Sequence, residues 1–189
     1  MATKGHLFII SGPSGAGKST ILVAILKKRP QLRYSISCTT RPPRGGEENG
    51  VEYHFVSEAV FRRKIDNGEF AEWAEVHGHL YGTSATYVEE VLVRGLDILL
   101  DIDVQGAKRL SAKYPEAISV FVTPPNMEEL EKRLLKRGVD SLAAVQRRLK
   151  NAKAEVAQAH DYGHVVVNDD LAQSVSDLES IIEEASGNE

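Results

Sequence analysis

The chain has 189 residues, of which 42% are hydrophobic and 26% charged, a composition typical of a globular protein long enough to bury a sizeable core. Its formal net charge of −4 argues against a nucleic-acid polymer as partner, because proteins that bind such polymers usually carry a basic surplus. The single cysteine, Cys38, excludes an internal disulfide and a cysteine-based zinc site.

The first predicted elements are a buried strand, a glycine-rich loop and a helix. Residues 7–10 form a short apolar run between glycines, which indicates a buried strand. Residues 19–29 place aliphatic side chains on one helical face, and Pro30 ends this helix. A short strand is predicted at residues 34–38, and a basic stretch rich in turn residues follows at 40–50.

The next part of the chain interrupts the alternation of strands and helices, and we expect a small β-rich insertion there. In chain order, we predict a helix capped by Ser57 and ending near Asn67, a hairpin of strands 70–76 and 79–81, and a helix that is capped by Thr83 or Ser84 and ends near Gly95.

Two strongly apolar runs, at residues 96–102 and 117–122, predict further buried strands. The other expected elements are helices at 104–113 and 127–137, a helix capped by Asp140 or Ser141 that reaches about His160, a strand at 165–167 and a helix at 171–185. Alternating strands and helices predict an α/β fold with a parallel sheet flanked by helices. No apolar stretch approaches the ~20 residues of a membrane helix, and the apolar run near the N-terminus is too short for a signal peptide, so we expect a cytoplasmic protein with no membrane partner.

The loop after the first strand carries the strongest motif. Residues 12–19 have the sequence GPSGAGKS, which matches G-x-x-x-x-G-K-[ST] in full. Glycines let the backbone N–H groups curl around phosphates, and the following helix adds its positive end. Lys18 is expected to contact the β- and γ-phosphates, and Ser19 to ligate Mg²⁺. Because GTPases, ATPases and small-molecule kinases share such loops, the motif predicts nucleotide binding and leaves the reaction open.

A second candidate anion site lies in the basic stretch. Arg41 and Arg44 flank two prolines, and their guanidinium groups suit phosphate oxygens. Tyr53 and Tyr81, predicted nearby, carry hydroxyls that can donate to the same anion. A solvated basic loop is the alternative, and it is the commoner outcome for such a stretch taken singly. Two arginines, two prolines and the following glycines in a protein with a phosphate loop favour a site for the acceptor phosphate.

Several colinear stretches give the chain a close resemblance to the guanylate kinases, which are P-loop nucleoside-monophosphate kinases. The stretches are SGPSGAGKST, SISCTTRPPRGGEENGVEYHFV, GEFAEWAEVHGHLYGT, ILLDIDVQGA, EKRLLKRG and VVVNDD. The resemblance implies an enzyme of purine nucleotide metabolism that transfers the γ-phosphoryl group of ATP to GMP, with dGMP as a further expected acceptor, giving ADP and GDP. It implies Mg²⁺ with ATP as the phosphoryl donor, and small nucleotides as the partners. The oligomeric state, monomer or homodimer, stays open.

The resemblance also implies a division of the chain into a core, an insertion and a helical lid over ATP. The P-loop core would comprise residues 1–36, 96–125 and 161–189, the β-rich GMP-binding region 37–95, and the lid region 126–160.

The resemblance assigns the acceptor site residue by residue. Glu72 would accept hydrogen bonds from N1–H and N2–H of guanine, donors that adenine lacks, so that adenine would leave a buried carboxylate unpaired. Without the resemblance, Glu72 would be taken for a surface carboxylate beside Trp73. The assigned GMP-binding residues are Ser37, Arg41, Arg44, Tyr53, Glu72, Tyr81, Thr83 and Asp101.

The donor site and the metal follow from the same resemblance. Asp101 ends an apolar strand and would support the Mg²⁺ bound by Ser19 through water, whereas Asp103 is also a plausible helix cap. The assigned ATP-binding residues are Gly12, Pro13, Ser14, Gly15, Ala16, Gly17, Lys18, Ser19, Thr20, Arg137 and Asn168. The assigned catalytic residues are Lys18, Arg41, Arg133 and Arg148. For the lid arginines, a charged face turned to solvent is the usual alternative.

Two other functions are weighed against this one. A kinase for AMP or TMP would share the phosphate loop but differ at the base-reading residues. A kinase-like module that binds protein partners is disfavoured, because the phosphate loop is intact. His77 and His79 lie in a predicted hairpin turn with no third ligand near in sequence, so a metal site there is not expected.

Overall fold

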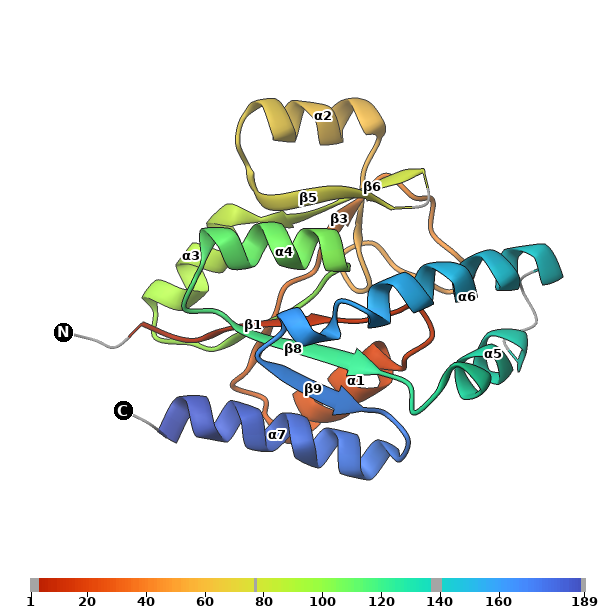
Figure 1. Cartoon of the computed structure of the whole chain (residues 1–189). Coiled ribbons are helices and arrows are strands. Elements are labelled where there is room, and N and C mark those ends of the chain that lie inside the picture. The colour runs from red at the N-terminus through yellow and green to blue at the C-terminus, as the bar shows by residue number, and fades with distance from the viewer. Residues whose placement is uncertain (1–3, 77, 137–140, 188–189) are drawn as a thin grey trace.

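The computed structural model describes residues 4–76, 78–136 and 141–187. Its core is a parallel sheet with the strand order β2-β7-β1-β8-β9. In that order the strands are Arg33–Tyr34, Ile98–Asp101, Leu7–Ser11, Ile118–Thr123 and His164–Val167. Figure 1 shows the sheet through the middle of the molecule with helices on both sides. The expected α/β core is therefore confirmed.

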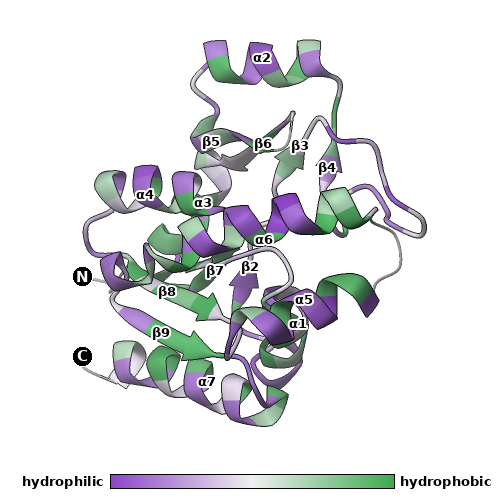
Figure 2. Ribbon diagram, turned by 45° about the vertical axis from the view of Figure 1, so that its right-hand side comes forward, coloured by the Kyte–Doolittle hydropathy of each residue, from purple (hydrophilic) through white to green (hydrophobic). Residues whose placement is uncertain are grey.

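The alternation of side chains along β1 explains why both faces of the sheet are covered. Phe8 and Ile10 belong to the apolar cluster formed with α1 and α7, whereas Leu7 and Ile9 belong to the cluster formed with α3 and α4. All four side chains are at most 3% exposed, and each stabilises the fold by about 1.5–3 kcal/mol through burial. The covering helices are α1 (Lys18–Lys28), α7 (Leu171–Gly187), α3 (Ala85–Val93) and α4 (Val104–Lys113). Figure 2 shows β8 and β9 as hydrophobic and the surrounding helices striped with hydrophilic residues.

A second, mostly antiparallel sheet has the strand order β4-β3-β6-β5. Its strands are His54–Phe55, Cys38–Thr39, His79–Ser84 and Phe70–Val76 in that order, and α2 (Glu58–Asp66) covers it. Phe61 of α2 is fully buried against Cys38 and Leu80. The predicted hairpin is thus confirmed, with its second strand longer than expected.

The single strand predicted at residues 34–38 is wrong. The segment divides between the two sheets, because Ser35 donates its backbone N–H to Leu99 of the core while the carbonyl of Ser37 accepts from His54 of the second sheet. Residues 35–37 therefore connect the core sheet to the second sheet. A local sequence pattern does not show that neighbouring residues pair with different sheets.

The remaining helices are α5 (Met127–Lys136) and α6 (Leu142–Val156), followed by a 3-10 turn, η1 (Ala159–Asp161). Leu130 and Leu134 of α5 form a small apolar cluster with Val145 and Ala152 of α6. The two helices lie side by side at one end of the molecule (Figure 1). The residue boundaries proposed for core, insertion and lid stay a prediction.

Serine side chains cap the amino ends of three helices, as predicted from the sequence. The hydroxyls of Ser57, Ser84 and Ser141 accept backbone N–H groups at the first turns of α2, α3 and α6. Ser84 rather than Thr83 caps α3, while Asp140, the alternative to Ser141, lies outside the described residues. In the part of the chain that the structure describes, no helix has the length and apolarity needed to cross a membrane.

Candidate functional site

The phosphate loop joins the end of β1 to the start of α1, so it lies between the carboxyl end of a core strand and the amino end of a helix. Gly17 has φ +93°, and a Cβ there would lie 2.1 Å from Nδ2 of Asn168. Only glycine fits this position, both because L side chains avoid such a φ and because the neighbouring amide fills the space. Two factors therefore require glycine at position 17: the positive φ of the loop backbone and the contact with Asn168, which is distant in sequence.

Lys18 begins α1 and points back across the loop. Its Nζ donates a 2.6 Å hydrogen bond to the carbonyl of Gly12 and lies 3.9 Å from Oδ1 of Asp101. Asp101 ends β7, the strand beside β1, so both residues stand at the carboxyl edge of the sheet. Burial raises the pKa of Asp101, and the charge of Lys18 opposes this rise.

Two of the predicted lid arginines contact the nucleotide-binding elements. Arg148 of α6 donates a 2.5 Å hydrogen bond from Nη2 to the hydroxyl of Ser14 in the phosphate loop. Arg133 of α5 donates from Nη2 to the carbonyl of Asn168 at 2.9 Å and from Nε to Glu129 at 3.3 Å. Both arginines are therefore half-buried and bonded to the phosphate loop or to the turn after β9. Arg137 lies outside the described residues.

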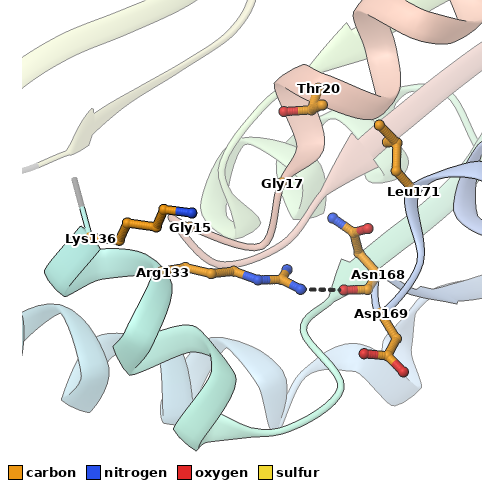
Figure 3. Close-up of a pocket in the computed structure, with 8 residues that line it drawn as sticks. All are labelled: Gly15, Gly17, Thr20, Arg133, Lys136, Asn168, Asp169 and Leu171. Carbon is orange, nitrogen blue, oxygen red and sulfur yellow. Dashed lines mark hydrogen bonds between the residues drawn. The ribbon is translucent and has the colours of Figure 1, made fainter.

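A cavity of about 360 Å³ opens beside the phosphate loop. Figure 3 shows Arg133 reaching across it from α5 toward the turn after β9, with Gly15 and Gly17 of the loop on the facing side. Its lining residues are Gly15, Gly17, Thr20, Arg133, Lys136, Asn168, Asp169 and Leu171. The cavity combines cations, backbone N–H groups and polar side chains, which suits an anionic nucleotide.

The side chain of Asn168, predicted to contact adenine, is engaged with protein groups. Its Nδ2 donates to the carbonyl of Ala16 at 2.7 Å, and its Oδ1 accepts from the hydroxyl of Ser174 at 3.2 Å. The residue is 7% exposed. Asn168 therefore holds the phosphate loop to the turn after β9, a contact that the sequence did not suggest.

Arg41 lies at the centre of a second cluster, where an anion site was predicted. Its side chain is 5% exposed and lies over the rings of Tyr53 and Phe55, at 5.3 and 5.7 Å from their centroids. Tyr53 meets Tyr81 edge to face at 5.8 Å. Burial and the nearby Asp101 raise the pKa of Tyr53 to about 12, so its hydroxyl remains a hydrogen-bond donor.

Glu47 neutralises the Arg41 guanidinium, and the sequence analysis missed it. Its two carboxylate oxygens accept from Nη1 and Nη2 of Arg41 at 2.9 Å each, and Oε2 also accepts the backbone N–H of Arg44 at 2.7 Å. The side chain of Arg44 is exposed and joins the cluster through this backbone contact. Acidic residues directly after a basic turn, Glu47 and Glu48, are the signal that could have pointed to this pairing.

Glu72 and Thr83 form a buried pair where guanine recognition was predicted. They are direct partners on β5 and β6, and the Thr83 hydroxyl donates to Oε1 of Glu72 at 2.7 Å. Glu72 is 7% exposed, so the surface-carboxylate alternative is wrong. Burial raises the pKa of Glu72 to about 7, and the hydrogen bond from Thr83 opposes the shift. Ser37, the third predicted base-reading residue, is half-buried next to β3.

The first turn of α4 lies between the Glu72–Thr83 pair and Asp101 at the end of β7. Asp103 caps α4 by accepting from the backbone N–H groups of Gln105 and Gly106, as the cap alternative stated. A Cβ on Gly106 would lie 2.6 Å from Oε2 of Glu72. The missing side chain at position 106 therefore makes room for the carboxylate, and Asp101 lies just before this turn.

A resident metal cage is absent from the described residues, since they contain no cluster of three or more histidine, cysteine or acidic side chains suited to an ion. Mg²⁺ in kinases uses one or two protein ligands together with phosphate oxygens and water, so no such cage is needed. Ser19 is exposed on the first turn of α1, and Asp101 stands at the neighbouring strand end. These two residues are the oxygen donors that would be available to an ion carried in with the nucleotide.

Comparisons with known proteins agree on one family. The sequence model for guanylate kinase matches residues 4–185. The chain is 51% identical to a guanylate kinase of Symbiobacterium thermophilum over 95% of this chain and 85% of that protein. It is 49% identical to a guanylate kinase of Dechloromonas aromatica over 94% of this chain and 88% of that protein.

Solved structures give the same result for the fold. The crystal structure of guanylate kinase from Anaplasma phagocytophilum superposes with a TM-score of 0.81 at 32% identity, covering 96% of this chain and 86% of that one. A shikimate kinase from Bacteroides thetaiotaomicron, with a TM-score of 0.50, 11% identity and coverage of 94% and 98%, shares the fold alone. By sequence over nearly its whole length and by structure, the chain belongs to the guanylate kinase family.

Proposed function

We propose that this chain is an ATP:GMP phosphotransferase in which the phosphate loop holds ATP and the second sheet holds GMP. The observation that carries the proposal is the buried Glu72–Thr83 pair, packed on the first turn of α4 next to Asp101. A buried carboxylate in a nucleotide cleft calls for a partner with two adjacent donors, which the N1–H and N2–H edge of guanine provides. AMP and TMP lack that pair of donors, so we expect both to be poorer acceptors than GMP. The base of dGMP is the same as that of GMP, so dGMP is expected to be an acceptor as well.

On the donor side, the loop from Gly12 to Thr20 surrounds the phosphates of ATP, and Lys18 exchanges the Gly12 carbonyl for β- and γ-phosphate oxygens. Adenine occupies the cavity between Thr20 and Leu171, close to Asn168. Lys136 and Asp169, which line the same cavity, join the ATP-binding residues in this proposal.

On the acceptor side, Ser37, Glu72 and Thr83 bind the guanine base, and Asp101 lies nearby. The GMP phosphate is held by the guanidinium groups of Arg41 and Arg44 and by two tyrosine hydroxyls, those of Tyr53 and Tyr81. The edge-to-face contact of the two tyrosine rings and the burial of Arg41 support a rigid clamp.

Phosphoryl transfer between these two sites depends on position and charge. Donor and acceptor phosphates are both anionic, and Lys18, Arg41, Arg133 and Arg148 offset their repulsion while holding them in line. An oxygen of the GMP phosphate attacks the γ-phosphorus, and the bond to the bridging oxygen of ADP breaks. Because that phosphate is already a dianion, no general base is required.

Mg²⁺ enters with ATP in this proposal, and it neutralises charge on the β- and γ-phosphates when bound. The Ser19 hydroxyl would be the protein ligand of the ion, and the Asp101 carboxylate would support it through water. Lys18, 3.9 Å from Asp101, opposes the rise that burial causes in the pKa of that carboxyl group.

The helices α5 and α6 act as a lid whose arginines exclude water from the transferring phosphoryl group. The contacts of Arg148 with Ser14 and of Arg133 with the Asn168 carbonyl support this role. The proposal includes the division into core, GMP-binding region and lid. It also includes a cytoplasmic location, where ATP and GMP are available, and small nucleotides rather than nucleic-acid polymers as partners.

A panel of monophosphates tests the function. With MgATP as donor, the chain is expected to phosphorylate GMP and dGMP with a kcat/KM far above that for AMP, dTMP or UMP, measured by coupled ADP release. A preference for AMP would contradict the role of Glu72. Lys18→Ala should lower kcat by orders of magnitude while its circular dichroism spectrum stays unchanged, and a kcat near that of the native chain would contradict the phosphate-loop assignment.

A further inference from the structure

The turn that carries the acceptor arginines contains an ion pair that the phosphoryl-transfer scheme does not use. Glu47 binds Nη1 and Nη2 of Arg41 at 2.9 Å each and the backbone N–H of Arg44 at 2.7 Å. The backbone N–H of Glu47 in turn donates to the carbonyl of Arg44 at 2.8 Å, which closes the turn. One carboxylate therefore ties together both arginine positions of the clamp.

The donors of Arg41 divide into two edges. Its end edge is taken by Glu47, and Nη1 also donates to the carbonyl of Pro42 at 2.8 Å. The Tyr81 hydroxyl also accepts a hydrogen bond from the Arg41 side chain. A guanidinium has N–H groups on Nε as well, so the side edge formed by Nε and Nη2 is suited to a second oxyanion that Tyr81 can share. Arg41 can hold Glu47 and a phosphate at once, on different edges.

We propose that Glu47 is a positioning residue for the acceptor phosphate: it fixes the Arg41 guanidinium and the Arg44 backbone in the phosphate-binding arrangement before GMP arrives. The inference rests on the proposed function, because it takes the GMP phosphate as the anion held by this turn. In the opposite role, Glu47 would compete with the GMP phosphate: its carboxylate would occupy N–H donors of Arg41 that the phosphate needs, and GMP would have to displace it.

Burial favours positioning over competition. The Arg41 side chain is 5% exposed and that of Glu47 is 21% exposed, so the pair is shielded from water and held by several contacts. An unpaired arginine at such a depth would be free to turn toward other acceptors, and fixing it would then cost binding energy when GMP enters. The hydrogen bonds from Arg41 keep the pKa of Glu47 below its usual value, so the carboxylate stays ionised at neutral pH.

The two roles predict opposite signs for Glu47→Gln, which keeps the shape and removes the charge. If Glu47 positions Arg41, the Kd for GMP measured by calorimetry rises by about tenfold or more. If Glu47 competes with the phosphate, the Kd for GMP falls. Glu48→Gln, in the next and exposed position of the same turn, is the matched control and is expected to bind GMP as the native chain does.

A ligand without phosphate separates positioning from general damage. Guanosine reaches the base-reading residues but not the clamp, so its affinity is expected to be the same in the native chain and in Glu47→Gln. An equal loss for guanosine and GMP would overturn the proposal, since it would indicate a damaged second sheet. Thermal unfolding of Glu47→Gln, followed by circular dichroism, verifies that the variant is folded at the assay temperature.

A double-mutant cycle with Arg41→Lys tests whether Glu47 acts through Arg41. Lysine cannot receive the two carboxylate oxygens on one planar edge, so Glu47→Gln is expected to change GMP affinity by less than about twofold in that background. A tenfold effect that persists in Arg41→Lys would overturn the proposal. Turnover of GMP by the native chain tests the proposed function separately: if it holds while Glu47→Gln binds GMP unchanged or tighter, only the positioning role fails.

Discussion

The hydroxyl of Thr83 donates a 2.7 Å hydrogen bond to Oε1 of Glu72, between directly paired positions of β6 and β5. Thr83 is fully buried and Glu72 nearly so. The strand register fixes the pair, and burial raises the pKa of Glu72 to about 7, with Asp103 adding to the rise and Arg109 opposing it. A raised pKa at the position proposed to read the guanine base has consequences for binding and for stability.

The first consequence is pH-dependent GMP binding. Only the ionised Glu72 accepts from both guanine donors, so affinity follows the fraction of ionised Glu72. With a pKa of about 7, the Kd for GMP should be about tenfold higher at pH 6 than at pH 8, measured by calorimetry. Glu72→Gln should bind GMP weakly and lose this dependence, while titration of the GMP phosphate itself affects both proteins alike. An equal pH profile in the two proteins would contradict the role of Glu72.

The second consequence is a gain of stability in Glu72→Gln. Because the folded pKa of Glu72 lies above the value of 4.5 for an exposed glutamate, the folded state binds its proton more tightly, and this contribution to stability is lost as pH rises from about 4.5 to 7. The free energy of unfolding of Glu72→Gln, from urea titration, should therefore exceed that of the native chain at pH 8 by up to about 3 kcal/mol, and by much less at pH 5. Glu75→Gln, exposed on the same strand, should show no such difference.

Gly106→Ala should disturb the acceptor site alone. The added Cβ would stand 2.6 Å from Oε2 and 3.2 Å from Cδ of Glu72, so the carboxylate must move. We expect the KM for GMP to rise by about ten- to a hundredfold with the KM for ATP unchanged, in steady-state assays. Gly163→Ala is the matched control, because its Cβ would make an ordinary contact of 3.5 Å with the carbonyl of Ser119. A KM for GMP that stays within twofold would show that Glu72 does not need this space.

Asn168→Ala should loosen the phosphate loop. The change leaves the carbonyl of Ala16 without its donor and the Ser174 hydroxyl without one acceptor. The free energy of unfolding should fall by about 1–3 kcal/mol, and the KM for ATP should rise more than that for GMP. Gln173→Ala, which removes an exposed hydrogen bond to Asp177, should change stability by less than about 0.5 kcal/mol. Equal KM changes for the two nucleotides would exclude a local effect on the loop.

Local sequence was sufficient to predict most elements of the fold and the phosphate loop. The phosphate loop, the helix-capping serines and the alternating apolar residues of β1 each act over a few neighbouring positions, so their patterns can be recognised without coordinates. The basic, proline-containing turn already marked Arg41 and Arg44 as a candidate anion site, and the family resemblance added Glu72, which no local pattern distinguishes from a surface carboxylate.

Only the tertiary structure decided which of these groups are buried and what they contact. The bond from Asn168 to Ala16 spans 152 positions, and the space for Glu72 comes from Gly106 on another element. The split of residues 34–38 between two sheets likewise depends on partners far along the chain. Burial, and with it the pKa of a carboxyl group, is a property of all the segments that surround it, and a sequence pattern reports only the residues next to it in the chain.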